Sequence, residues 1–70
     1  MEIYQLVLKL PTGYRTVFNL FVKEGYDHRE ISRALHITES ASRSQLTHAK
    51  VLLQKMLTLQ NNYYGKDEQR

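Results

Sequence analysis

Apolar residues recur at steps of three and four positions through most of this chain, the spacing of one face of an α-helix. The first such stripe predicts a helix from Glu2 to Lys9 and consists of Ile3, Leu6, Val7 and Leu10. A wider stripe predicts a second helix from Pro11 to Glu24 and consists of Tyr14, Val17, Phe18, Phe21 and Val22. Proline suits the first position of a helix and glycine its end, so Pro11 and Gly25 are expected to bound the second helix.

The stretch from Asp27 to Lys50 has the layout of a helix-turn-helix, two helices joined by a tight turn. Asp27 is a typical N-cap, and Glu30 three positions later completes an acidic version of the capping box. A third helix is therefore expected from His28 to Leu35. Its inward side chains are Ile31, Ala34 and Leu35.

The turn at residues 36–38 leads into the longest predicted helix. His36 is expected to take the left-handed conformation, in which histidine is enriched among residues other than glycine. Thr38 is the expected N-cap of this fourth helix, which should end near Asn61. On a helical wheel the inner face carries Ser42, Leu46, Ala49, Leu53 and Met56. The opposite side and its boundary carry Ser40, Arg43, Ser44, Thr47, His48, Lys50 and Lys55.

These elements predict an all-α fold, a four-helix domain over residues 1–62 with a helix-turn-helix and a long C-terminal recognition helix. No winged elements are expected, and residues 63–70 are expected to form a polar, disordered tail. A chain of 70 residues allows one small domain. The absence of cysteine excludes disulfides and a thiolate zinc site and fits a reducing cytoplasm. No apolar run has the length of a membrane span, so no membrane partner is expected.

Residues 28–55 carry a net charge equal to that of the whole chain, +3, because they hold five basic and two acidic side chains. The sequence pI of about 9.4 also favours a nucleic-acid partner. Short polar side chains beside basic ones let a helix approach the base edges of the major groove. The residues with this spacing are Ser40, Arg43, Ser44, Thr47 and His48, with Gln45 at the side. Lys50, Lys55 and Arg29 are expected to bind phosphates.

Catalysis is not expected in so short a chain. The pairs Asp27 with His28 and Ser44 with His48 have the residue types of acid–base chemistry, but no pocket-forming fold supports them. The histidines at 28, 36 and 48 are too far apart to suggest a metal triad. The sequence thus predicts no metal, cofactor or small-molecule substrate.

Residues 10–57 resemble region 4 of the extracytoplasmic-function (ECF) sigma factors of the sigma-70 family, in a form similar to those of Bacteroidetes. The resemblance rests on Leu10-Pro11, Arg15 to Phe18, Glu24-Gly25, His28 to Ile31 and the run Arg43 to Lys50. It implies that the fourth helix binds the −35 promoter element in double-stranded DNA. It also implies docking on the flap of RNA polymerase and, as is frequent in the family, control by an anti-sigma factor.

The resemblance assigns DNA contacts position by position. The recognition-helix contacts fall on Arg43, Ser44, Gln45, Thr47, His48 and Lys50, and the backbone contacts on His28 and Arg29. The chain departs from the family pattern at four of its positions. His48 and Lys50 replace the two arginines of an Arg-Ala-Arg run, and Gln45 and Ser42 replace a common arginine and valine. Region 2, which binds the −10 element, does not fit in 70 residues, so the resemblance implies an excised fragment that binds DNA weakly.

Two other functions fit the same pattern. A self-standing, dimeric LuxR-type regulator would use the apolar residues late in the fourth helix as a dimer seam, namely Leu52, Leu53, Met56, Leu57 and Leu59. A protein-interaction module without a DNA role would instead use the apolar residues of the first two helices to bind a partner helix.

Overall fold

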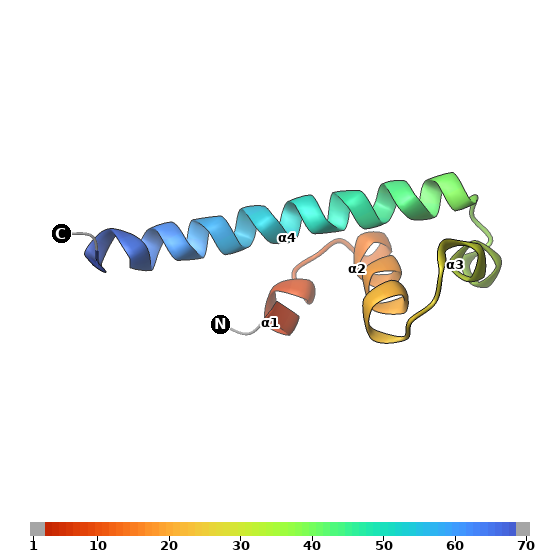
Figure 1. The fold of residues 1–70 in the computed structure, drawn as a ribbon, viewed down its shortest axis with the longest axis horizontal. Helices are drawn as coiled ribbons and strands as arrows, with labels where there is room; N and C mark the ends of the chain where they lie inside the picture. Colours follow the sequence, from red (N-terminus) through yellow and green to blue (C-terminus); the bar gives the residue numbers. More distant parts are fainter. Residues whose placement is uncertain (1–2, 69–70) are drawn as a thin grey trace.

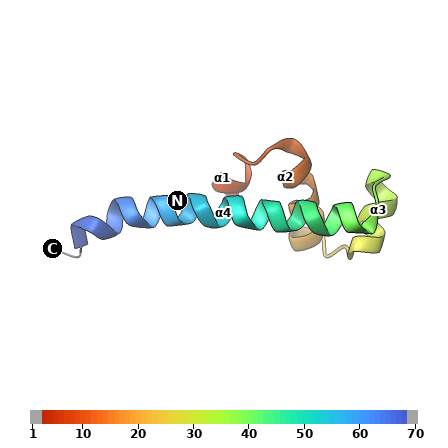
Figure 2. The same cartoon turned by 90° about the horizontal axis from the view of Figure 1, so that it is seen from above.

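A long helix, α4, runs the length of the molecule, and the other helices pack along one side of it. The computed structural model describes residues 3–68, with side chains up to Leu59. In chain order the elements are α1 (Ile3–Val7), α2 (Thr12–Phe18), the π-helix η1 (Asn19–Lys23), α3 (His28–Leu35) and α4 (Glu39–Glu68). Figures 1 and 2 show α3 near the start of α4, α2 further along it and α1 beyond α2. No strand occurs within residues 3–68, and the all-α, four-helix prediction is confirmed.

The first helix is shorter than predicted. It ends at Val7 instead of Lys9, and the backbone N–H groups of Lys9 and Leu10 each bond to the carbonyl three residues earlier. These tight turns bring Leu10 into the core, where its side chain is 4% exposed. Pro11 is the N-cap of α2, with φ −52° and ψ 148°, and does not occupy the predicted first helical position.

The second predicted helix changes its hydrogen-bond pattern halfway. From Asn19 to Lys23 it is a π-helix, and the N–H of Glu24 bonds to the carbonyl of Asn19 at 3.0 Å. A bond across five residues widens the turn, so side chains no longer follow the 3.6-residue spacing. Val22, which the spacing assigned to the apolar face, is therefore 52% exposed.

The backbone of the helix-turn-helix has the predicted caps and turn. The Asp27 side chain accepts from the Glu30 N–H at 2.8 Å, and the Glu30 side chain accepts from the Asp27 N–H at 3.0 Å, a complete capping box. His36 is left-handed, with φ 57° and ψ 44°. The Ser32 carbonyl accepts from the N–H groups of His36 and Ile37, and the Ser32 hydroxyl donates to the Ile37 carbonyl. Ser32 thus closes the turn through both its carbonyl and its hydroxyl.

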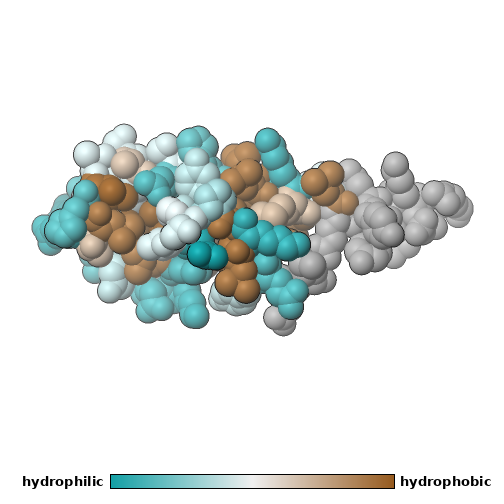
Figure 3. All heavy atoms as spheres, turned by 180° about the vertical axis from the view of Figure 1, so that it is seen from behind, coloured by the Kyte–Doolittle hydropathy of each residue, from teal (hydrophilic) through white to brown (hydrophobic). Residues whose placement is uncertain are grey.

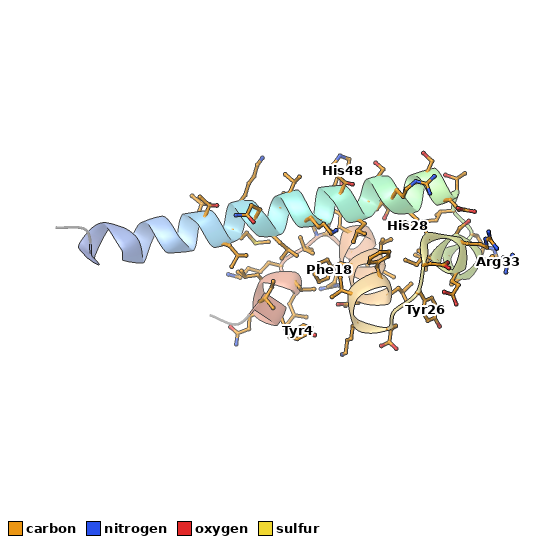
Figure 4. The ribbon with its side chains drawn as sticks, viewed as in Figure 1. Tyr4, Phe18, Tyr26, His28, Arg33 and His48 are labelled. Atoms are coloured by element: carbon orange, nitrogen blue, oxygen red, sulfur yellow. The ribbon has the colours of Figure 1, made fainter. Side chains whose placement is uncertain are left out.

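The core lies between the inner face of α4 and the shorter helices. On α4 the buried side chains are Ser42, Leu46, Ala49 and Leu53, as the wheel predicts. From the other elements Leu6, Val7, Leu10, Val17, Phe18 and Ile31 join them, while Ile3 and Ala34, predicted to be inward, are exposed. Figure 4 shows Phe18 of α2 on the side of that helix nearer α1, below α4.

The end of α4 lies beyond the predicted one. The helix continues past Asn61 to Glu68, through much of the segment expected to be a polar tail. No proline interrupts this segment, and its one glycine disfavours a helix by only about 1 kcal/mol. The division into a domain at residues 1–62 and a tail at 63–70 stays a prediction. Among the described residues, no helix combines the length and the apolar character needed to cross a membrane.

Candidate nucleic-acid interface

The first half of α4 has a surface of polar side chains that no other described helix covers. Thr38 caps this helix, because its hydroxyl accepts from the Ala41 N–H at 2.9 Å. We call the exposed polar residues on this side, up to Lys50, the outer face; they are Ser40, Arg43, Ser44, Thr47 and Lys50. At 100° per residue they span roughly one third of the helix circumference. Short side chains at three of the five positions leave room for another molecule to approach the helix backbone.

Arg43 lies with Lys50 toward one edge of the outer face. Its guanidinium lies 3.8 Å from the Glu39 carboxylate one turn earlier, and the two side chains are 58% and 49% exposed. An exposed pair of this kind contributes little to stability, so a competing anion can separate it. Thr47 donates its hydroxyl to the Arg43 carbonyl at 3.0 Å, which leaves the oxygen lone pairs and the methyl group of Thr47 available.

Two predicted contact residues lie on the other flank of α4, against α2. A Cβ added to Gly13 would stand 3.2 Å from the Gln45 side-chain oxygen, so the side chain of Gln45 packs closely over this glycine. The ring of Tyr14 meets the imidazole of His48, with centroids 5.5 Å apart. Gln45 is half-buried, while His48 stays exposed at the upper edge of α4 in Figure 4. Gln45 is thus set apart from the five outer-face residues, whereas His48, one turn after Ser44, lies at their edge.

The start of α3 places its two predicted contacts in different surroundings. Arg29 is exposed. His28 is half-buried, and its Nδ1 lies 2.8 Å from the hydroxyl oxygen of Ser42. Its ring also stacks on Phe21, with centroids 4.8 Å apart and planes 26° apart. One signal for this contact was present in the sequence, since Ser42 stands on the apolar face of α4 and a buried hydroxyl needs a partner.

The charged and polar groups of the described residues do not suggest another kind of site. Within the described residues, no three histidine, cysteine, aspartate or glutamate side chains lie close enough to hold a metal ion. The basic side chains Lys50 and Lys55 are exposed along α4. α4 thus has small polar and basic side chains on its outer side and an apolar face toward the core. A recognition helix that binds in the major groove of DNA has the same two faces.

Comparison with protein families gives a match to the family described as Sigma-70, region 4, over residues 1–53. This segment contains the four shorter elements and the first half of α4, and with them every predicted contact residue except Lys55. Comparisons with curated proteins and with solved structures gave no match.

Proposed function

The chain belongs to the sigma-70 region 4 family, and on that basis we propose that it binds promoter DNA through the outer face of α4. Membership makes the chain a DNA-binding domain of transcription initiation that recognises the −35 promoter element and binds RNA polymerase. It is not an enzyme domain. The observation that supports our assignment of the DNA surface is that Ser40, Arg43, Ser44, Thr47 and Lys50 are exposed on one side of the capped helix.

The proposed contacts follow from side-chain chemistry. Arg43 is the base-reading residue, because a guanidinium can bond to the O6 and N7 atoms of guanine together. Ser44 and Thr47 bind the neighbouring base edges or phosphates. Lys50 and Arg29 bind phosphates, which sets affinity and its dependence on salt more than the choice of sequence.

Gln45 and His48 are proposed as contacts at the margin of the interface. His48 is exposed and can reach a phosphate or a base from the α2 side of the helix. Gln45 is half-buried over Gly13, so it would have to leave that position to pair with an adenine. His28 remains a backbone contact implied by the resemblance, although its Nδ1 is occupied by Ser42.

The ECF subtype, the flap of RNA polymerase, an anti-sigma factor and a cytoplasmic location are parts of the same proposal. They are supported by the resemblance of residues 10–57 to ECF sigma factors. Exposed apolar side chains away from the outer face offer surfaces for such protein partners; on α1 and η1 they are Ile3, Tyr4 and Val22. Figure 3, which views the molecule from behind, shows apolar residues in separate areas with polar ones between them.

The dimeric alternative is less well supported by the packing. Leu53 is buried, and three other members of its predicted seam pack against the core, namely Leu52, Met56 and Leu57. Only Leu59, 69% exposed, is left at the surface among the five. A seam used within the chain is not available to a second copy.

The direct test places the same negative charge at two exposed threonines on one side of α4. Thr47→Glu puts a carboxylate on the outer face, and Thr58→Glu puts one eleven positions further along, outside the matched segment. We expect Thr47→Glu to weaken binding to a −35 duplex at least tenfold (about 1.4 kcal/mol) and Thr58→Glu to change it less than twofold. Equal effects of the two variants, with both folded by circular dichroism, would show that the outer face is not the DNA surface.

A further inference from the structure

Among the described residues, the buried side chains on the inner face of α4 include one polar group, that of Ser42. Its exposed fraction is 0%, and it lies on the same face as Leu46 and Ala49. A buried hydroxyl without a partner costs about 1–3 kcal/mol in protein mutational data. Among the described residues its partner is His28, whose Nδ1 lies 2.8 Å from the serine oxygen.

The imidazole of His28 connects three elements. It belongs to the first residue of α3, bonds to Ser42 on α4 and stacks on Phe21 of η1 with centroids 4.8 Å apart. A hydrogen bond has a narrow range of length and angle, whereas apolar packing tolerates sliding. This contact therefore defines where α4 starts relative to α3 more sharply than the surrounding apolar side chains do.

The two ring nitrogens have different surroundings. No buried side-chain nitrogen or oxygen lacks a hydrogen-bond partner within the part of the chain described. The structure shows a partner for Nδ1 and none for Nε2 among these residues, so Nε2 reaches the surface. If Ser42 donates its proton to Nδ1, the proton of the neutral ring resides on Nε2.

We propose that His28 and Ser42 are a positioning pair that holds the outer face of α4 in register with the promoter. Ser42 donates to Nδ1 of His28, and this bond fixes the start of α4 against α3 and η1. Ser42 directly precedes Arg43, so a rotation of the helix at Ser42 moves the base-reading guanidinium. A recognition side chain must be placed to within about half an ångström. Loss of the hydrogen bond at Ser42 can displace Arg43 by more than this distance. The inference rests on the proposed function and adds two residues that bind no base themselves.

Two substitutions of His28 by residues with side-chain amides distinguish the role of Nδ1 from that of Nε2. The side-chain amide of His28→Asn stands where Nδ1 stood and can bond to Ser42, whereas that of His28→Gln stands where Nε2 stood. The ratio of dissociation constants for a scrambled duplex and a −35 duplex is measured for each variant at fixed salt, below the onset of unfolding. We expect His28→Gln and Ser42→Ala to lower this ratio about tenfold and His28→Asn to lower it less than about threefold.

A spectroscopic measurement tests the pair independently of DNA. Nitrogen-15 NMR of the histidine rings should show the proton of neutral His28 on Nε2 in the wild type and a mixture of tautomers in Ser42→Ala. An unchanged specificity ratio in His28→Gln and Ser42→Ala, or unchanged tautomers in Ser42→Ala, would overturn the proposal. If the wild type itself does not prefer the −35 duplex, the proposed function fails and the positioning role fails with it. Wild-type preference that survives in the variants contradicts the positioning role alone.

Discussion

The ring of Tyr14 lies against the imidazole of His48, with centroids 5.5 Å apart and planes tilted by 45°. Tyr14 belongs to α2 and His48 to α4. Tilted aromatic pairs at this separation contribute about 0.5–1.5 kcal/mol beyond the apolar area that they bury. The contact therefore stabilises the crossing of the two helices and orients an exposed imidazole beside the outer face.

Loss of the Tyr14 ring should lower stability in a way that depends on His48. We expect Tyr14→Leu to cost about 1 kcal/mol of unfolding free energy and Tyr14→Phe to cost much less, because phenylalanine keeps the ring. In urea denaturation, the cost of Tyr14→Leu should be smaller when His48 is already alanine. Strictly additive losses in this double-mutant cycle would mean that the two rings do not stabilise each other.

Arg43 and Lys50 should affect DNA binding differently, although both are exposed cations on the outer face. Arg43→Ala is expected to relax the preference at one base pair of the −35 element by about 1–3 kcal/mol. Lys50→Ala is expected to weaken binding to all duplexes alike and to reduce the slope of log K against log salt by about 1. Titrations of promoter and scrambled duplexes at several salt concentrations measure both effects.

For this pair of variants the comparison is Lys55→Ala, which removes a predicted phosphate contact that lies beyond the segment matching the family. It should change the salt slope less than Lys50→Ala does. Equal losses on promoter and scrambled duplexes for both Arg43→Ala and Lys50→Ala would disprove the division of roles.

Glu39 should oppose DNA binding. Its carboxylate lies 3.8 Å from the Arg43 guanidinium and would also stand near the phosphates once α4 enters the groove. We expect Glu39→Gln to tighten binding to every duplex by about threefold, because an exposed ion pair is worth less than 1 kcal/mol. The same change should lower unfolding free energy by a few tenths of a kcal/mol, since a negative charge stabilises the first turn of a helix. Glu24→Gln removes a similar charge at the end of η1 and should leave affinity unchanged; weaker binding by Glu39→Gln would contradict this argument.

Local signals were sufficient to predict the helix-turn-helix. The caps at Asp27 and Thr38 and the left-handed residue His36 act within a few positions of the chain, so sequence spacing alone identifies them. The inner face of α4 was also predictable, because its apolar and small residues keep the 3.6-residue period. The family match supports the DNA-binding function that the polar side of this helix suggested.

Features that depend on contacts between distant residues were not predicted. The bond between His28 and Ser42 joins positions 14 apart, and Gln45 meets Gly13 from another helix. The π-helix at Asn19–Lys23 depends on a backbone pattern that helical periodicity does not reveal, and it brings Val22 to the surface. The positions of individual contact residues therefore needed the fold, whereas the class of function did not.

The left-handed residues His36 and Gly25 should respond in opposite ways to substitution. His36 has φ 57° with a β-carbon, which costs about 1 kcal/mol, and Gly25 has φ 78° without that cost. We expect His36→Gly to raise unfolding free energy by up to about 1 kcal/mol, partly offset by the greater freedom of glycine in the unfolded chain. Gly25→Ala should lower it by about 1 kcal/mol through backbone strain alone, because no atom lies within 4 Å of the added β-carbon. Thermal unfolding measures both effects, because in a domain of this size a change of 1 kcal/mol in stability shifts the melting temperature by about 4–8 °C. A loss of stability in His36→Gly would mean that the imidazole makes a stabilising contact greater than the strain it imposes on the turn.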